Sequence, residues 1–319
     1  MEHKNNFDFL RLLAALFVTF SHSYGWVNPE LQKIYLSKYG LIIFFSISGY
    51  LITASLKNSY SIKEFLVKRI LRIYPLLILT VLLTFIYAIF VTELPLKKFL
   101  INKDTLSYLF NFSGLTTRYN LPGIEKSMHG SLWSISVEIR LYLSLVLLSL
   151  MNFLTSKKVS LVVLFFTIFY GFYSAITHHY YFCIYGICFW LGSFLYLHGS
   201  RYLNFIKKNN FWILLLMLYF LVTILFPTFI LMDFFEMLIF SSITLVIGNS
   251  KAYFSLHGQD YSYSIYLFSP LVQRLLVYMF SFQHPIYHFL VTLIALLPCC
   301  YLSWNYFEKP FLNFKKKFI

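Results

Sequence analysis

Long apolar stretches alternate with short polar connections along almost the whole chain. Ten stretches each hold about 20 mostly apolar residues, the length that an α-helix needs to cross the hydrocarbon core of a bilayer. They are residues 7–25, 39–56, 73–92, 131–153, 159–177, 180–198, 211–227, 228–248, 261–281 and 286–306. At these lengths only helices satisfy their own backbone hydrogen bonds in lipid. The pattern therefore predicts an all-α fold, a polytopic membrane helix bundle with about ten transmembrane helices.

The distribution of basic residues predicts the orientation of this bundle. An even number of spans places both termini on the same side of the membrane. If that side is the cytoplasm, sixteen of the 26 Lys and Arg residues lie in inner segments and seven lie outside. Because cytoplasmic loops carry an excess of Lys and Arg, both termini are predicted to be cytoplasmic. The net charge of +14 is thus interpreted as membrane topology and not as nucleic-acid binding.

Composition excludes the soluble classes. The chain is 59% hydrophobic and 12% charged, whereas soluble domains are about 25% charged. The first apolar stretch contains Asp8 and Arg11 and lacks a small-residue cleavage site, so it is expected to remain as a helix and not to act as a cleaved signal peptide. The four cysteines lie in apolar runs, which indicates buried thiols and no disulfide framework.

One connection, residues 93–130, is long and polar, and the predicted topology places it outside. Loops of this length are often functional. With no internal repeat or change of composition along the chain, residues 1–319 are predicted to form a single membrane domain. The loop histidines His129, His178 and His179 have no partner at ligand spacing, so no metal site is predicted.

Ionisable residues inside the predicted spans are candidates for function, because a charge at the bilayer centre costs about 2.5–3.5 kcal/mol on insertion scales. They are Arg11, His22, Glu138, Arg140, Asp233, Glu236 and Arg274.

Two of these residues, His22 and Glu138, are candidates for catalysis. Arg11 and His22 are eleven residues apart, so they lie on one helix face, about 16 Å from each other along the axis. Glu138 enters from the opposite side and reaches a depth comparable to that of His22. A carboxylate near an imidazole can orient it or share its proton. Two structural alternatives stay open: His22 as an interfacial residue in water, and Glu138 in an ion pair with Arg140 or Arg274.

Two further pairs of charges are candidates for binding. Arg69 and Arg72 share one helical face, where they form either a cytoplasmic anchor belt or an anion site that matches phosphate oxygens. Asp233 and Glu236 also share a face. Their carboxylates could bind hydroxyls of a polar substrate or balance the membrane arginines.

Six short motifs occur in order from one end of the chain to the other. They are Phe7-Asp8-Phe9-Leu10-Arg11 running on to His22, Phe44-Phe45-Ser46-Ile47-Ser48-Gly49-Tyr50-Leu51-Ile52, Lys68-Arg69-Ile70-Leu71-Arg72-Ile73-Tyr74-Pro75, Leu132-Trp133-Ser134-Ile135-Ser136-Val137-Glu138, Ser262-Tyr263-Ser264-Ile265-Tyr266-Leu267 and Tyr306-Phe307-Glu308-Lys309-Pro310-Phe311. Together they resemble the motifs of the membrane-bound acyltransferase-3 family, whose members O-acylate glycans and other small acceptors. The chain departs from the family pattern at Ser269, where relatives commonly have a histidine, and it carries no fused C-terminal hydrolase-like domain.

The resemblance implies a multi-pass enzyme of the bacterial inner membrane, an O-acyltransferase for groups other than aminoacyl groups. Its donor would be cytoplasmic acyl-CoA, with acetyl-CoA expected and no permanently bound cofactor. Its acceptor would be a hydroxyl of a surface polysaccharide, such as lipopolysaccharide, or of a lipid-linked precursor. Its partners would then be acyl-CoA, the glycan or lipid-linked sugar and the lipid bilayer.

The resemblance also implies a role for each candidate residue. Arg69 and Arg72 would grip the phosphates of CoA, with Arg11 nearby. His22 would act as general base or as acyl carrier, and Glu138 would orient it. Asp233, Glu236 and Arg274 would bind the acceptor.

Two other classes of function remain as alternatives. A transporter of a small anionic or polar solute would use the same intramembrane Arg, His and Glu residues as its path. The absence of matching halves in the sequence counts against a transporter. A catalytically inactive scaffold is the second alternative, and the presence of both His22 and Glu138 argues against it.

Overall fold

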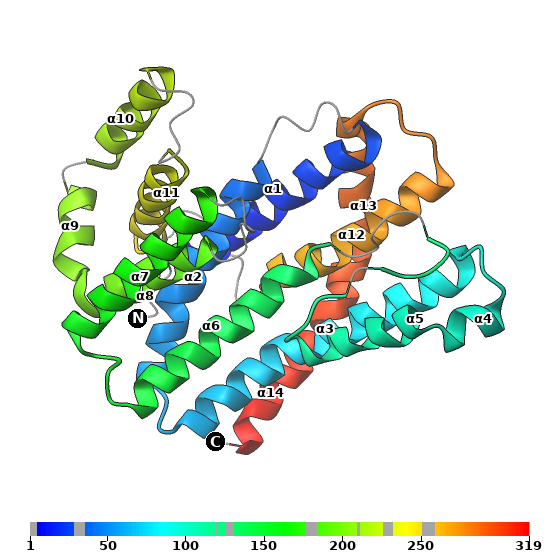
Figure 1. Ribbon diagram of the computed structural model, residues 1–319, viewed down its shortest axis with the longest axis horizontal. Coiled ribbons are helices and arrows are strands. Elements are labelled where there is room, and N and C mark those ends of the chain that lie inside the picture. Colours follow the sequence, from blue (N-terminus) through cyan, green and yellow to red (C-terminus); the bar gives the residue numbers. More distant parts are fainter. Residues whose placement is uncertain are drawn as a thin grey trace. The chain divides into compact units, whose positions relative to one another are not determined.

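The computed structural model describes residues 5–28, 36–118, 120–124, 130–176, 184–208, 211–225, 232–250 and 259–318. Within these ranges the chain forms helices and connections and no strand, as Figure 1 shows. Cys183 and the loop histidines His129, His178 and His179 lie outside the described ranges. The all-α prediction is confirmed for the described part of the chain.

The helices follow one another with short connections. They are α1 (Phe7–Val27), α2 (Leu36–Lys57), α3 (Ile62–Val91), α4 (Leu96–Ile101), α5 (Lys103–Tyr108), the 3-10 helix η2 (Leu109–Ser113), α6 (Leu132–Leu150), α7 (Lys157–Ile176), α8 (Tyr185–His198), α9 (Ser200–Lys208), α10 (Phe211–Leu225), α11 (Met232–Gly248), α12 (Ser262–Met279), α13 (Pro285–Ser303), the π-helical segment η4 (Trp304–Glu308) and α14 (Lys309–Phe318).

Each of the ten apolar ranges overlaps one of the α-helices, and the largest difference is at α3. This helix begins at Ile62, eleven residues before the predicted start of the span at residue 73. The Ser61 side chain caps it by accepting from the Glu64 backbone N–H at 3.1 Å, and the Glu64 carboxylate accepts from the Tyr60 N–H at 2.7 Å. Pro75 lies inside the helix, so the basic run before it is helical too.

Four helical segments of the described chain are long and apolar enough to cross a membrane. They are Leu36–Lys57, Ile62–Val91, Leu132–Leu150 and Pro285–Phe314, and the bent pair of α9 and α10 could form a fifth. Helix α1 has 21 residues, but Asp8, Arg11 and His22 reduce its apolar character. Helices α8, α10 and α11 have 14, 15 and 17 described residues, fewer than the roughly 20 that a span needs. Ten crossings therefore stay a prediction.

The chain forms two compact units that interleave along the sequence. Unit 1 comprises residues 1–14, 38–59 and 140–258, and unit 2 comprises 15–37, 60–139 and 259–319. Helices α1 and α6 each contribute residues to both units. No single boundary along the sequence separates the units, and the single membrane domain stays a prediction.

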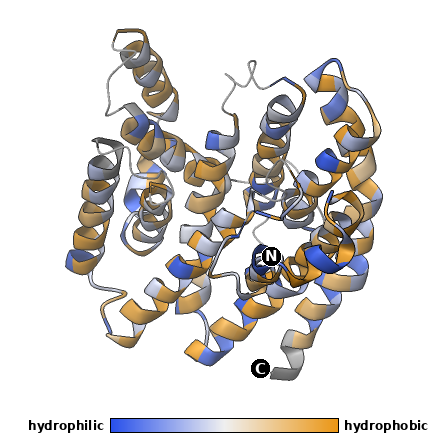
Figure 2. Ribbon diagram, turned by 45° about the vertical axis from the view of Figure 1, so that its right-hand side comes forward, coloured by the Kyte–Doolittle hydropathy of each residue, from blue (hydrophilic) through white to orange (hydrophobic). Residues whose placement is uncertain are grey.

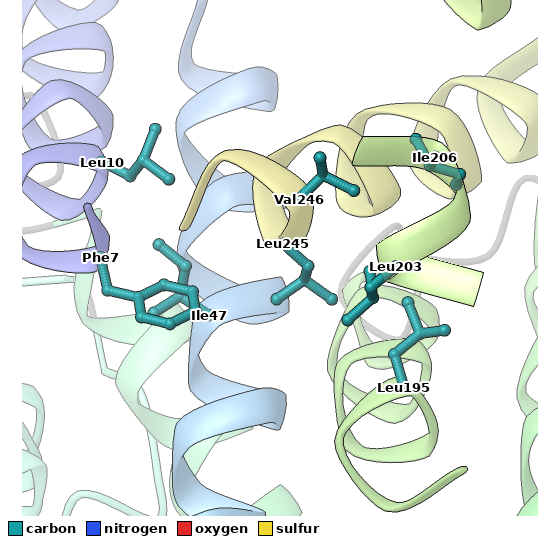
Figure 3. Packing of buried hydrophobic residues seen from close by; sticks show 8 residues of the cluster. All are labelled: Phe7, Leu10, Ile47, Leu195, Leu203, Ile206, Leu245 and Val246. Carbon is teal, nitrogen blue, oxygen red and sulfur yellow. The ribbon is translucent and has the colours of Figure 1, made fainter. Parts of the chain in front are cut away.

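A cluster of aliphatic and aromatic side chains forms part of the core of unit 1. Its buried members come from α1, α2, α8, α9 and α11, as Figure 3 shows, and they are Phe7, Leu10, Ile47, Leu195, Leu203, Ile206, Leu245 and Val246. The N-terminal end of α1 is fixed to this cluster by Asn6, whose backbone N–H donates to Gly248 O at 3.1 Å.

Helices α2 and α8 of unit 1 touch through their backbones. A Cβ atom added at Gly49 would overlap the carbonyl oxygen of Phe189, and one added at Gly192 would overlap the carbonyl oxygen of Ser46. The close approach lets Thr53 Oγ1 donate to Ser193 Oγ at 2.8 Å. Small residues and interhelical hydrogen bonds of this kind are typical of helix packing in membranes.

In unit 2 the long connection between α3 and α6 is folded onto its neighbours. Phe99 and Tyr108 are fully buried, and the Phe85 and Phe99 rings lie 6.1 Å apart. Ser136 Oγ of α6 donates to Leu115 O at 2.8 Å. Residues 93–130, predicted as a polar loop, therefore hold the short helices α4, α5 and η2.

The outward surface of several helices is apolar. Phe90 is 80% exposed, Phe165 63% and Ile294 68%, whereas the hydroxyl residues Thr80 and Thr292 are fully buried. Figure 2 shows that hydrophobic residues make up much of the helical ribbon. Large apolar side chains outside and small polar ones inside are expected where lipid is the solvent.

The glycine contact between α2 and α8 can be tested with matched substitutions. We expect Gly49→Ala to destabilise the protein by about 1–3 kcal/mol, because the new methyl group displaces the α8 backbone and this outweighs the gain in helix propensity. Gly130→Ala is the control, since nothing lies within 4 Å of a Cβ atom at Gly130. Thermal unfolding in detergent measures both variants, and equal midpoints would contradict the contact.

Candidate active site

The turn of α1 that carries His22 is bound by hydrogen bonds from other elements of unit 2. Gln273 Nε2 of α12 donates to Thr19 O at 2.7 Å and to Ser23 Oγ at 2.8 Å. Ser21 Oγ accepts from the Ser37 backbone N–H at 2.8 Å. His22 itself is partly buried between these anchored residues. Its ring is therefore carried by a turn whose backbone is fixed on two sides.

The helix that carries Glu138 is bound by the same α12. Ser134 Oγ lies 2.6 Å from Tyr266 Oη, which also donates to Ser131 O at 3.1 Å. Glu138 follows Ser134 by four residues, or one helical turn, and is partly buried. Helix α12 thus binds the α6 turn that precedes Glu138 and, about two turns later, the α1 turn that carries His22. Both predicted catalytic residues lie in unit 2.

Arg72 of α3 is engaged by two carboxylates of unit 2. Its Nη2 lies 2.5 Å from Asp260 Oδ2 and its Nη1 lies 3.2 Å from Glu308 Oε2. The Glu308 side chain is 2% exposed, and its other oxygen accepts from Ser303 Oγ at 3.2 Å. The Arg72 guanidinium also lies 5.6 Å from the centre of the Tyr263 ring. This ion-pair cluster joins α3, the start of α12 and η4.

The other basic residues of this α3 segment have different surroundings. The Arg69 guanidinium lies 5.8 Å from the centre of the Phe65 ring, and the residue is partly buried. Lys68 forms an ion pair with Glu64 one turn earlier. Of the two arginines predicted to bind phosphate, Arg72 is therefore bound by carboxylates and Arg69 lies beside an aromatic face.

Asp233 and Glu236 share a lysine. Lys38 Nζ of α2 lies 2.5 Å from Asp233 Oδ1 and also forms an ion pair with Glu236. The Glu236 side chain is 6% exposed and that of Asp233 is 48% exposed. The structure thus gives these carboxylates a cation that the sequence interpretation did not consider, since Lys38 lies just before the predicted span 39–56.

The last two candidates lie in different units. Arg274 of α12 places its guanidinium 5.1 Å from the centre of the Trp26 ring, in unit 2. Arg11, in unit 1, lies 3.5 Å from Asp8.

Three residues that sequence reasoning missed take part in these contacts: Lys38, Asp260 and Gln273. Asp260 was an overlooked signal, because an acidic residue next to the Ser262-Tyr263 motif can face the basic motif of α3. Gln273 gave no signal, since a lone amide in an apolar run is also typical of helix packing. Ser269, at the family's histidine position, is fully buried, and its Oγ has no hydrogen-bond partner in the described part of the chain.

Comparison with known proteins identifies the family. The model of the acyltransferase domain of the acyltransferase-3 family matches residues 4–305. The chain therefore belongs to the acyltransferase-3 family, as its six motifs indicated. No solved structure matches it.

Two curated relatives resemble about half of the chain. Nodulation protein 10 of Rhizobium leguminosarum bv. viciae is 34% identical over 168 residues, which cover 46% of this chain and 44% of the relative. The O-acetyl transferase of Shigella phage Sf6 is 35% identical over 149 residues, which cover 44% of this chain and 45% of the relative. The matches thus span less than half the length of these relatives.

The Arg72 cluster predicts a stability difference between Arg72 and an exposed basic residue of the same helix. We expect Arg72→Gln to destabilise the protein by about 3 kcal/mol, because the Asp260 and Glu308 carboxylates lose their shared cation. Lys63→Gln is the control on α3, where the side chain is exposed, and should cost about 0.5 kcal/mol or less. Thermal unfolding in detergent measures both. An Arg72→Gln protein as stable as the control would contradict the assignment of the cluster.

The shared lysine gives a second prediction. Lys38→Met leaves two carboxylates three residues apart without their ammonium group, so a loss of about 3 kcal/mol is expected. Adding Glu236→Gln should recover part of this loss, since it removes the more buried of the two charges. Unfolding midpoints of the single and double variants provide the measurement. Strict additivity of the two substitutions would show that Lys38 and Glu236 do not interact.

Proposed function

We propose that the chain is an integral membrane O-acyltransferase. It moves an acetyl or similar short acyl group from cytoplasmic acyl-CoA to a hydroxyl of a surface polysaccharide or of its lipid-linked precursor. The observation that carries this proposal is the family match over residues 4–305. The name of the phage Sf6 relative, O-acetyl transferase, supports acetyl as the transferred group.

The proposed topology has ten crossings with both termini in the cytoplasm. The apolar outward surfaces of α3, α7 and α13 support a lipid environment. The excess of Lys and Arg in the inner segments supports the orientation. In this arrangement the basic run of α3 lies at the cytoplasmic side, where acyl-CoA is available.

His22 is the proposed reactive group. Its imidazole removes the proton from the acceptor hydroxyl as the oxygen attacks the thioester carbonyl carbon. The carbon–sulfur bond then breaks, and the CoA thiolate receives a proton from the imidazolium. Alternatively an imidazole nitrogen attacks the thioester first, and CoA leaves as a thiolate that takes up the imidazole proton. The acceptor hydroxyl then takes the acyl group and returns its proton to the imidazole. Histidine suits both routes because its ordinary pKa of about 6.5 lies close to working pH.

Glu138 is the proposed partner of His22, as the residue that orients the imidazole and stabilises its charged form. The shared attachment of α1 and α6 to α12 supports this pairing, because it ties both helices to one element. Within unit 2, α12 is thus hydrogen-bonded to the α1 turn that carries His22 and to the α6 turn that precedes Glu138.

Arg69, Arg72 and Arg11 are the proposed contacts of the CoA phosphates. Arg72 already holds Asp260 and Glu308, so an anion must compete with two carboxylates there. Arg69 stays a proposed contact of the phosphates, and the Arg72 ion pairs fix the helix that carries it. Asp233, Glu236 and Arg274 remain the proposed acceptor-binding residues. At the first two, acceptor hydroxyls would join the Lys38 ion pair.

The enzyme and the transporter predict different outcomes in proteoliposomes. With labelled acetyl-CoA on the cytoplasmic side and membrane-derived glycan as acceptor, the proposal expects label to become covalently attached to glycan. Flux of label across the membrane without any acylated product would support transport and overturn the proposal.

The catalytic pair can be tested in the same assay. His22→Ala and Glu138→Ala should insert and fold but lose about 10²- to 10⁴-fold in kcat, the range of general acid–base catalysis. Arg69→Gln should mainly raise KM for acetyl-CoA. His198→Ala is a control that removes another partly buried histidine, on α8 of unit 1. Near-normal acyl transfer by His22→Ala would show that His22 is not the reactive group.

A further inference from the structure

The side chain of Gln273 is fully buried and has one determined orientation. Its amide nitrogen donates to the Thr19 carbonyl and to the Ser23 hydroxyl of α1, at 2.7 and 2.8 Å. Because a backbone carbonyl can only accept, the NH2 group and not the oxygen must face Thr19. Both amide hydrogens are therefore used on a single turn of α1.

His22 lies in that turn. It follows Thr19 by three residues and directly precedes Ser23, so its side chain leaves the helix about 60° from that of Thr19. The Ser23 hydroxyl also donates to Thr19 O at 3.3 Å, so the two residues that Gln273 binds are hydrogen-bonded to each other. Gln273 thus binds the Thr19 carbonyl, three residues before His22, and the Ser23 side chain, directly after His22.

Gln273 is itself held by α13. His288 Nε2 lies 3.2 Å from the backbone carbonyl oxygen of Gln273, and Thr292 Oγ1 donates to the backbone carbonyl oxygen of His288 at 2.7 Å. Gln273, His288 and Thr292 are all 0% exposed. Buried hydrogen bonds thus connect α13 to the backbone of α12 at Gln273, and the Gln273 side chain connects α12 to α1, all within unit 2.

Packing alone does not explain a glutamine at this place. Its Oε1 has no hydrogen-bond partner among the described residues although the side chain is fully buried. A buried acceptor without a donor costs free energy, and a leucine of similar size would avoid that cost. The two hydrogen bonds to the turn of His22 are what the amide supplies and a leucine cannot.

We propose that Gln273 is a positioning residue for His22, which acts by fixing the register and rotation of the α1 turn between Thr19 and Ser23. This inference rests on the proposed function for its catalytic consequence, and on the structure alone for its effect on the imidazole.

Three variants of the full-length protein test this role. Gln273→Leu removes both hydrogen bonds, Gln273→Glu keeps the shape but replaces the donating group, and Ser23→Ala removes one acceptor with little change in volume. Thr53→Val is the matched control, because it removes a buried interhelical hydrogen bond of 2.8 Å in unit 1.

Two measurements are made on each purified variant in nanodiscs. The first is the kinetics of acyl transfer. A displacement of about 1 Å at a reacting group can cost about 100-fold, so kcat should fall by about that factor in both Gln273 variants while KM for acetyl-CoA stays constant. Ser23→Ala should fall between these variants and the wild type, and Thr53→Val should match the wild type.

The second measurement is the rate at which diethyl pyrocarbonate modifies His22, followed by mass spectrometry of the peptide. We expect this rate to rise severalfold in the Gln273 variants and to stay unchanged in Thr53→Val, since only the former release the turn of His22. Unchanged His22 reactivity together with unchanged kcat in Gln273→Glu and Ser23→Ala would overturn the inference.

The two measurements also separate the inference from the proposed function. If the wild type transfers no acyl group, the proposed function fails, yet the His22 reactivity still decides whether Gln273 positions it. If Gln273→Leu does not fold, Ser23→Ala carries the test. Equal losses of kcat in Ser23→Ala and Thr53→Val would show a general packing effect and overturn the positioning role.

Discussion

A polar side chain inside a membrane bundle has no water to bind, so the protein itself must supply its hydrogen-bond partner. Three contacts between helices described above supply such partners. Thr53 bonds Ser193 between α2 and α8, Ser134 bonds Tyr266 between α6 and α12, and Gln273 bonds α1. Each of these bonds fixes the rotation of a helix about its axis, which apolar contacts with lipid-like surfaces do not.

The same constraint governs the charges. Lys38 lies between Asp233 and Glu236, and Arg72 lies between Asp260 and Glu308. In both clusters one cation from an early helix meets two carboxylates that are distant in the sequence. The Arg72 cluster also explains why three motifs of the family occur together in the chain: the α3 motif, the Ser262-Tyr263 motif and the Glu308 motif meet at a single guanidinium. A substitution in any one of these three motifs therefore changes the contacts of the other two.

These contacts define how the enzyme is proposed to work. Helix α12 binds the α1 turn that carries His22 and the α6 turn that precedes Glu138. Arg72, in the basic run of α3, binds Asp260 just before the start of α12. The proposed donor-binding and reactive elements of unit 2 are thus attached to one helix. The family match supports the proposed acyl transfer, and these hydrogen bonds fix the turns that carry or precede the proposed groups.

The sequence by itself determined the all-helical fold, the approximate positions of ten helices and the family, because apolar periodicity and motif order are local properties of the chain. It also selected His22 and Glu138 as candidates, since charges in apolar runs are costly wherever they fold. The two α3 arginines were selected because they share one helical face. Only the tertiary structure decided that Arg72 is held by Asp260 and Glu308, that Lys38 joins Asp233 and Glu236, and that Gln273 binds the turn of His22. These partners are separated by up to 254 residues, and no local pattern can state which of many buried polar groups will meet.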